Sequence, residues 1–541
     1  MPMKNICFRS MKDLMSLLLL LLSGLLIAGC NGGTENTGPT DLTKVSIIPK
    51  PVLVEPDSGL FIFTKRSDIF VPGASEELVR IGQYLADLLN PSTGLGMEVV
   101  VGHGKPRKGD IKLVLSDDAS GLGEEGYELL ISEKLLTVTA NKPAGLFYGI
   151  QTIRQLLPAS IEMNTLQEGP WEIATGTIRD YPDYEYRGAM RDVARHFFGV
   201  DDIRIFIDQM AAYKMNVLHM HLSDDQGWRI EIKSWPNLTV HGSATEVGGG
   251  EGGFYTREEY AEIVKYAGER YITIIPEIDM PGHTNAALSS YAELNIGGKA
   301  TEPYTGTRVG FSTLDTKSEV TYRFVDDVIR ELASLTPGPY IHIGGDESHS
   351  TRTEDYISFV NRVQDIVISH GKKVIGWDEI ALAKLKPGAV VQYWSKAENA
   401  TRAVNQDARV LMSPSSYAYL DMKYDSASTF GYNWAGYTEV DDAYNWDPAT
   451  LVPGITKDNI IGIEAPLWSE TISDRQQAEY LLFPRLPGYA EIGWTEASNR
   501  NWDDYRIRLS DHGARMKAMG ISYYPSVRVD WAGMSSVSDA D

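Results

Sequence analysis

Two neighbouring acids, Asp346 and Glu347, follow an apolar run and a Gly-Gly pair at 344–345. When two adjacent carboxyl groups are removed from water they cannot both ionise freely, so the pKa of one rises and that group keeps its proton. We assign the protonated role to Glu347. A protonated acid beside an ionised one can perform general acid–base chemistry, such as the cleavage of a glycosidic bond.

Six further apolar runs end in clusters of acids, histidines, arginines or tryptophans. These clusters lie at 187–195, 219–229, 277–283, 377–379, 392–394 and 468–470. Tryptophan rings cover the C–H faces of a sugar, whereas carboxylate and guanidinium groups bind its hydroxyls. Taken together, the clusters predict a site for a polar, ring-shaped ligand, and a sugar fits that description.

Short apolar runs that alternate with amphipathic helical stretches must position these clusters. The predicted strands are 186–190, 216–222, 272–277, 340–345, 373–377, 390–394, 409–413 and 460–465. Apolar residues recur at i, i+3, i+4 and i+7 over 203–210, 260–267 and 325–332, the second stretch following a capping box at Thr256 and Glu259. Alternating strands and helices imply a parallel sheet, and eight repeats predict an α/β fold with a (β/α)8 TIM barrel. Catalytic groups then project from the C-terminal ends of the strands.

Two connections in this region are unusually long. One spans 224–255 and ends in a glycine-rich run, and the other spans 414–459 and is rich in tyrosine, aspartate and tryptophan. Loops of this length are usually functional, so we expect both to contribute to the site.

The residues before the barrel predict a smaller α+β domain over 43–182, in which we find no catalytic constellation. Its expected strands are 45–48, 60–63, 111–115, 127–131 and 136–140, and its expected helices are 75–89 and 144–157. The barrel is expected over 183–525, closed by a helix at 502–518, with a polar C-terminal tail at 526–541.

The N-terminus has the pattern of an export signal. Lys4, Arg9 and Lys12 precede an apolar run at 14–28, which is too short to span a bilayer and ends just before Cys30. The pattern resembles a bacterial lipoprotein signal, which implies cleavage of residues 1–29, acylation of Cys30 and a lipidated tether at 30–42. We therefore expect a lipid anchor to a membrane of the cell envelope. The alternative is an ordinary signal peptide in which Cys30 is incidental.

Composition restricts the class of protein. The chain has 541 residues, of which 43% are hydrophobic and 23% charged, as in an ordinary globular protein. The formal net charge of −23 argues against a nucleic-acid partner, because phosphate binding needs a basic face.

The stretch 342–347 resembles the His-x-Gly-Gly-Asp-Glu motif of the family 20 β-N-acetylhexosaminidases. Further motifs match in the same order at 187–196, 221–225, 277–283, 376–379, 419–421 and 468–470, and 144–151 is similar to part of the domain that precedes the barrel in these enzymes. The resemblance covers about 43–525. It implies an exo-acting, retaining enzyme that acts on oligosaccharides or glycoconjugates with a terminal N-acetylhexosamine, and it implies no metal or other cofactor.

The resemblance also implies that the 2-acetamido oxygen of the substrate attacks the anomeric carbon and forms an oxazolinium ion. Asp346 would orient the acetamido N–H, and Glu347 would protonate the leaving oxygen and later deprotonate water. Asp224 and His283 would form a relay that supports Glu347, with Asp225 as the alternative to Asp224. The residues expected to bind the sugar are Tyr419 at the acetamido carbonyl, Trp377, Trp394 and Trp468 around that pocket, and Arg187, Asp421 and Glu470 at the ring hydroxyls.

Two other functions fit parts of the sequence. His219 and His221 lie on one face of a strand, as two zinc ligands of a metallohydrolase would. A lipid-anchored glycan-binding protein with an inactive barrel is the second alternative, although binding alone requires neither the acid pair nor a histidine relay. We expect His219 and His342 to be hydrogen-bonded core residues.

Overall fold

The computed structural model describes residues 41–73, 75–102, 104–117 and 120–532. The predicted signal peptide, Cys30 and nearly all of the predicted tether lie outside these residues, as does the end of the predicted tail, so the structure does not bear on them. Within the described ranges, no helix is both long enough and apolar enough to cross a membrane.

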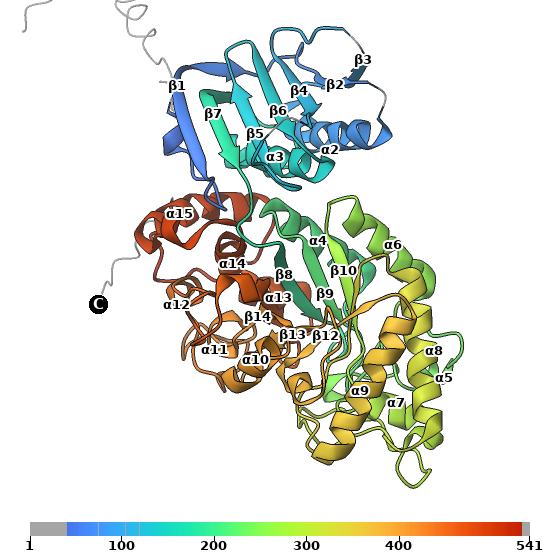
Figure 1. The fold of residues 1–541 in the computed structure, drawn as a ribbon. Coiled ribbons are helices and arrows are strands. Elements are labelled where there is room, and N and C mark those ends of the chain that lie inside the picture. The colour runs from blue at the N-terminus through green and yellow to red at the C-terminus, as the bar shows by residue number, and fades with distance from the viewer. Residues whose placement is uncertain (1–40, 74, 103, 118–119, 533–541) are drawn as a thin grey trace, which may run out of the picture. The chain divides into compact units, whose positions relative to one another are not determined.

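The first part of the described chain is an α+β domain built on a seven-stranded sheet. Its strands are β1 (Leu53–Ile62), β2 (Ile69–Pro72), β3 (Val99–Gly102), β4 (Asp110–Leu115), β5 (Tyr127–Ile131), β6 (Leu135–Ala140) and β7 (Glu172–Asp180). They lie in the order β1-β7-β5-β6-β4-β2-β3, antiparallel from β1 to β6 and parallel from β6 to β3. Helices α2 (Glu76–Thr93) and α3 (Pro143–Leu156) cover one face of the sheet (Figure 1).

The sequence of α2 shows why a helix forms here. Ser75 caps the helix by accepting a hydrogen bond from the Leu78 amide, and the apolar face that includes Ile81 and Leu85 is buried. The helix ends at Gly94, whose φ of 62° lies in the left-handed region that glycine adopts without strain.

One predicted strand of this domain is wrong. Residues 45–48 form no strand, because Ile47 and Ile48 are buried and the Ile48 amide donates to the Gln155 side chain instead of a neighbouring strand. Conversely, β2, β3 and β7 were not predicted; the first two are four-residue strands bordered by proline or glycine.

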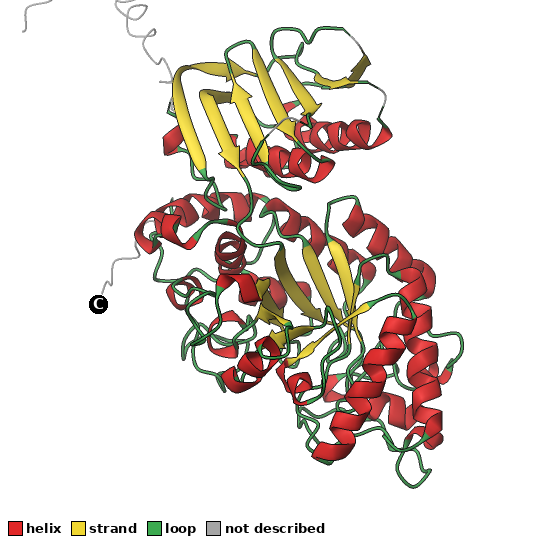
Figure 2. Ribbon diagram, viewed as in Figure 1, coloured by secondary structure: helices red, strands yellow, loops and turns green. Residues whose placement is uncertain are grey.

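The second part of the chain is a closed barrel of eight parallel strands, which confirms the predicted fold class (Figures 1 and 2). The strands are β8 (Tyr186–Asp192), β9 (Val217–His221), β10 (Thr273–Glu277), β11 (Tyr340–His342), β12 (Lys373–Trp377), β13 (Val390–Tyr393), β14 (Arg409–Met412) and β15 (Ile460–Leu467). Each pairs with the next along the chain, and β15 pairs with β8 to close the ring. All eight predicted strands are therefore present, with shifted ends.

Helices surround the barrel between and after the strands (Figure 2). They are α4 (Val200–Ala212), α5 (Asn237–Val240), α6 (Arg257–Gly268), α7 (Asn285–Ser290), α8 (Glu319–Leu335), α9 (Thr353–Ser369), α10 (Ala397–Val404), α11 (Ser415–Ala418), α12 (Val440–Tyr444), α13 (Arg475–Leu482), α14 (Arg485–Trp494) and α15 (Trp502–Ala518). The predicted capping box of Thr256 and Glu259 starts α6, and the helix predicted at 502–518 is α15. Between β12 and β13 the chain forms only a 3-10 turn, η5 (Asp378–Leu382).

Candidate active site

A cavity of about 420 Å³ opens at the C-terminal ends of the barrel strands, where the sequence predicted the site. The residues that line it come from the ends of β8, β11, β13, β14 and β15 and from two loops: Arg195, Thr307, Val309, Asp346, Glu347, Trp394, Tyr419, Asp421, Tyr432, Trp434, Trp468 and Glu470. The structure thus brings most of the predicted site residues into one cavity.

The Gly-Gly pair after β11 directs both acids into this cavity. Gly344 and Gly345 have φ values of 65° and 106°, which residues other than glycine rarely adopt. A Cβ on Gly344 would lie 1.8 Å from Asp279 Oδ1, and the Gly345 amide donates to that same oxygen at 2.9 Å. Glycine is therefore required here, because the backbone must pass directly against the Asp279 carboxylate.

His283 lies between the acids and a buried aspartate. Its Nε2 is 3.6 Å from Asp346 Oδ2 and 3.6 Å from Glu347 Oε2, and its Nδ1 is 3.2 Å from Asp224 Oδ1. Asp225 instead accepts hydrogen bonds from the Asn285 amide and the Ser312 hydroxyl. The geometry therefore selects Asp224 as the partner of His283.

The pKa directions of the two acids differ from the sequence prediction. Complete burial, followed by the charges of Asp279 and Glu347, raises the pKa of Asp346 well above its ordinary value. Burial also tends to raise the pKa of Glu347, but the hydrogen bond and positive charge of His283 outweigh it and lower that pKa. The prediction that Glu347 carries the raised pKa is therefore wrong for the unliganded protein. His283 lies 3.6 Å from both acids, but at Asp346 deeper burial and the charges of Asp279 and Glu347 outweigh its effect on the pKa.

Aromatic rings form one wall of the cavity. Trp394 and Tyr419 are stacked at 6.3 Å between ring centroids, and Tyr419 lies 6.2 Å from Trp468. Trp377 does not line the cavity: it is fully buried behind Trp468, at 5.6 Å between centroids, and its indole N–H donates to Glu277. Burial, and then the charge of Asp346, raises the pKa of Tyr419 well above its ordinary value, so its phenol remains a hydrogen-bond donor.

Buried carboxylate oxygens on the cavity residues have no hydrogen-bond partner within the described part of the chain. These atoms are Asp346 Oδ1, Asp421 Oδ1 and Glu470 Oε2. Buried polar atoms normally have partners, so oxygens of this kind are suited to the hydroxyl and N–H donors of a ligand.

Arg187 is not at this site, and its predicted contact with the sugar is wrong. It is the second residue of β8, at the opposite end of the barrel, where its guanidinium donates to Glu125 of the α+β domain at 2.9 Å. Arg195, past the C-terminal end of the same strand, lines the cavity and contacts Asp224 at 2.7 Å. The arginine at the site is therefore Arg195, the last arginine of the same motif.

Sequence reasoning also missed four lining residues. Tyr432 and Trp434 belong to the long loop at 414–459, whose composition was the available signal. Thr307 and Val309 lie between α7 and α8 in a segment that carries no such signal. The glycine-rich run at 248–253, which we expected to contribute, is not among the residues that line the cavity.

His219 and His221, the two histidines of the zinc alternative, are hydrogen-bonded to carboxylates. His219 Nδ1 is 2.9 Å from Glu464, and the ring nitrogens of His221 contact Glu277 and Asp224. By distance alone, His219, Glu277 and His342 could hold a metal ion, but each has a hydrogen bond to another buried group. As predicted, His219 and His342 are buried, hydrogen-bonded core residues.

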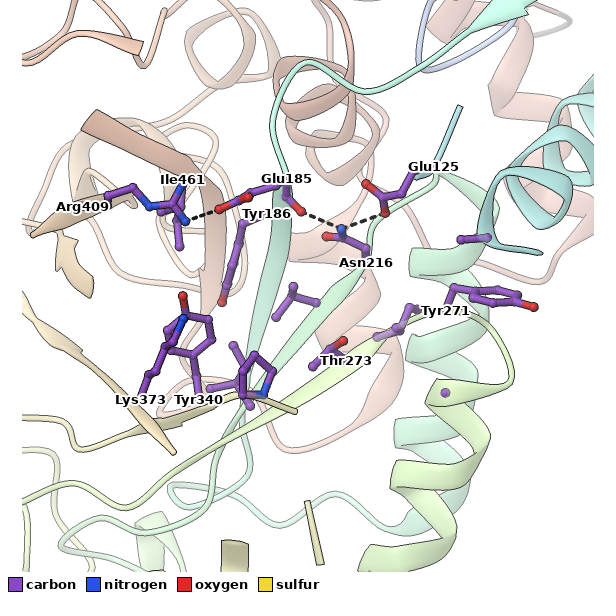
Figure 3. Close-up of a pocket in the computed structure, with 16 residues that line it drawn as sticks. Glu125, Glu185, Tyr186, Asn216, Tyr271, Thr273, Tyr340, Lys373, Arg409 and Ile461 are labelled. Carbon is purple, nitrogen blue, oxygen red and sulfur yellow. Dashed lines mark hydrogen bonds and ion pairs between the residues drawn. The ribbon is translucent and has the colours of Figure 1, made fainter. Parts of the chain in front are cut away.

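A second cavity, of about 640 Å³, lies at the N-terminal end of the barrel (Figure 3). Its floor is formed by barrel residues such as Tyr186 and Ile461. Its two carboxylates are already engaged: Glu185 pairs with Arg409, and Glu125 accepts a hydrogen bond from Asn216. The larger cavity therefore lacks the unpartnered carboxylates that mark the smaller one.

A TIM barrel with an acid pair, a histidine relay and an aromatic wall at its C-terminal end defines a glycoside hydrolase. The model of "Glycosyl hydrolase family 20, catalytic domain" matches residues 184–497, and that of "Glycosyl hydrolase family 20, domain 2" matches residues 44–181. The chain belongs to glycosyl hydrolase family 20 and is a β-N-acetylhexosaminidase that acts by substrate-assisted catalysis. This assignment decides against the metallohydrolase and the inactive barrel.

Similar proteins are known from several bacteria. The chain is 42% identical over 502 residues to the β-N-acetylhexosaminidase of Cellulomonas fimi, which covers 92% of this chain and all of that protein. It is 50% identical, with a TM-score of 0.87, to the family 20 β-N-acetylhexosaminidase structure from Streptomyces coelicolor A3(2), covering 91% and 99% of the two chains. A mutant β-hexosaminidase from Streptomyces plicatus in complex with the product GlcNAc is 51% identical, with the same TM-score and 91% and 98% coverage.

Proposed function

We propose that the smaller cavity binds the terminal β-linked N-acetylglucosamine or N-acetylgalactosamine of an oligosaccharide or glycoconjugate. Asp421 and Glu470 accept hydrogen bonds from ring hydroxyls, and Arg195 takes the role predicted for Arg187. Asp346 accepts from the acetamido N–H, while the Tyr419 phenol donates to the acetamido oxygen. The unpartnered oxygens and the aromatic wall support this arrangement.

The reaction then takes two steps. In the first, the acetamido oxygen bonds to the anomeric carbon, the glycosidic bond breaks, and the leaving oxygen takes the proton of Glu347. In the second, water bonds to the anomeric carbon and gives a proton to Glu347 as the oxazolinium ring opens, so the β configuration is retained. The observation that supports this route is that Asp346 and Glu347 approach the same nitrogen of His283. Both acids therefore lie on one side, whereas a protein nucleophile and its acid flank the bond from opposite sides.

We infer that the pair holds one proton before substrate binds, because the pKa of Asp346 is raised and that of Glu347 is lowered. That proton resides on Asp346, whose pKa is raised, while Glu347 is ionised beside His283. The substrate N–H stabilises the ionised form of Asp346, and a leaving group that covers Glu347 removes water and raises its pKa. Binding therefore moves the proton from Asp346 to Glu347 and prepares both groups, with no net proton taken up.

A stable thiazoline mimic of the oxazolinium ion tests this function. Because it resembles the high-energy intermediate, we expect it to inhibit hydrolysis of a chromogenic β-N-acetylglucosaminide with an inhibition constant at least about 100-fold below that of N-acetylglucosamine. Equal inhibition by the two compounds would favour a protein nucleophile. Trapping of a glycosyl ester on any side chain would contradict the mechanism directly.

We also propose that the mature protein is anchored through lipid on Cys30, with residues 30–42 as a tether, in the cell envelope. The support is the sequence pattern of basic residues, a short apolar run and a single cysteine at its end. On expression in a bacterium that processes lipoproteins, the wild type should partition into the detergent phase of a detergent–water separation, because an acyl chain confers membrane affinity. Cys30→Ser should partition into water, and Cys7→Ser serves as the matched control that keeps the wild-type behaviour. Recovery of the wild type in water would contradict the anchor.

A further inference from the structure

The relay behind Glu347 does not end at Asp224. Asp224 Oδ2 lies 3.0 Å from Nε2 of His221, and Nδ1 of His221 forms a short contact with Glu277. Carboxylate and imidazole groups therefore alternate along one row: Glu277, His221, Asp224, His283 and Glu347. The first four members are buried, so each interacts with its neighbours in place of water.

The row is part of a network that crosses the barrel. Glu277 also contacts His219 at 3.0 Å, His219 bonds to Glu464 at 2.9 Å, and Glu464 accepts from the Tyr186 hydroxyl. Tyr186 lines the second cavity (Figure 3) and is the first residue of β8, whereas the acids follow the C-terminal end of β11. The interior of the barrel is thus filled along this path by paired polar groups as well as by apolar side chains.

Hydrolysis by the proposed route returns the proton to Glu347, so the reaction needs no proton path to the far side of the barrel. The charges of the row instead fix the orientation of its side chains. Burial opposes the charged forms, but the alternating neighbours raise the pKa of His221 and of His283 and lower that of Asp224. Charges alternate in sign along the row, and each ion fixes the orientation of the next.

We propose that His221, clamped by Glu277, is a positioning residue that acts through Asp224 and His283 to hold the N–H of His283 toward Glu347 and Asp346. The proposal rests on the function argued above and extends the machinery by two residues. It also explains the His219-x-His221 pattern: His221 belongs to the catalytic row, and His219 supports Glu277 from the other side.

Every element packed against the row contributes charged groups that enter its pH dependence. The charged groups are Asp192, Arg195 and Glu470 from the ends of β8 and β15, Asp279 after β10, Asp346 after β11 and His219 beside Glu277, and the titratable His342 also contacts Glu277. Arg195 alone contacts three acids, Asp192, Asp224 and Glu470. These neighbours are unchanged in the variants described next, so a difference between the pH profiles of wild type and variant reports the substituted residue.

The test compares His221→Gln and Glu277→Gln with the wild type on a chitobiose-type substrate over a range of pH. Loss of a charge-assisted hydrogen bond should lower kcat about 10- to 100-fold in both variants, with KM nearly unchanged. In His221→Gln, His283 is held less firmly, so the pKa of Glu347 rises toward its ordinary value and the acid limb of kcat/KM moves to higher pH. Glu277→Gln loosens the same row but also removes a negative charge, which lowers the pKa of nearby acids, so its acid limb should move to higher pH by less than that of His221→Gln.

Glu491→Gln is the matched control, because Glu491 is an equally buried carboxylate on α14 that binds Arg508 and Tyr444. It should lower thermal stability without changing kcat per folded molecule or the pH profile. If the His221 and Glu277 variants behave like this control, the positioning role is refuted.

If His221→Gln fails to fold, ¹⁵N-histidine NMR of the wild type provides the test: a neutral His221 at pH 7 would overturn the proposal. A wild type inactive on β-N-acetylglucosaminides would instead refute the function itself.

Discussion

Glu347→Gln should lower kcat/KM by about 10² to 10⁴ on oligosaccharides, whose leaving groups need a proton, and much less on activated aryl glycosides. Glutamine preserves the size of the side chain but cannot donate a proton to the departing oxygen. The measurement is a series of aryl β-N-acetylglucosaminides of increasing leaving-group pKa, on which the rate of the variant should fall more steeply than that of the wild type.

The pH profile gives this variant a second signature. In the one-proton description proposed above, we expect wild-type activity to fall at high pH when that proton leaves Asp346, whose pKa is raised. With glutamine in place of the Glu347 acid, activated substrates require only an ionised Asp346, and their rate should no longer fall at high pH. Equal losses on all leaving groups, or an unchanged alkaline limb, would contradict the role of Glu347 as the acid.

The placement of the site could be predicted because barrel architecture relates sequence position to space. Residues that follow a strand lie at the C-terminal end, so Asp346, Trp394 and Glu470 could be assigned to one cavity without knowledge of their contacts. The same rule, applied strictly, would have corrected the assignment of Arg187. Arg187 is the second residue of β8 whereas Arg195 follows the strand, and only Arg195 lines the cavity.

What the sequence could not provide was the environment of each group. Asp346 and Glu347 are adjacent and chemically alike, but one is buried beside Asp279 and the other faces His283. That difference depends on the fold of a distant segment, the turn after β10, and it decides which acid holds the proton. The same limit applies to Val309, which lines the cavity only because its loop returns to the barrel.

Local patterns misled where tertiary contacts replaced secondary structure. Ile47 and Ile48 belong to an apolar stretch that favours a strand, but in the described part of the chain they pair with no strand. Their burial beside Gln155 satisfies the apolar side chains and the backbone amide without a sheet. By contrast, the capping box of α6 depends on four consecutive residues, and a pattern that local could be predicted from the sequence alone.

Asp346→Asn should lower kcat/KM by about 10² to 10³, and by a similar factor on oligosaccharides and activated aryl glycosides. Asparagine keeps the shape but removes the negative charge that balances the forming oxazolinium ion. That charge is needed when the acetamido oxygen attacks, whatever the leaving group, so the loss should not follow leaving-group pKa. Steady-state kinetics on the same aryl series used for Glu347→Gln measures both patterns.

The pH profile of this variant should change in a direction that the geometry fixes. Without Asp346 to hold the proton, Glu347 must carry it alone, and His283 lowers the pKa of Glu347. The alkaline limb of kcat/KM should therefore move to lower pH, whereas in Glu347→Gln that limb disappears on activated substrates. Asp225→Asn is the matched control: it removes a buried carboxylate that binds Asn285 and Ser312, outside the cavity, and should leave the limb in place. An Asp346→Asn profile that coincides with the wild type would mean that the proton resides elsewhere, and the one-proton description of the pair would fail.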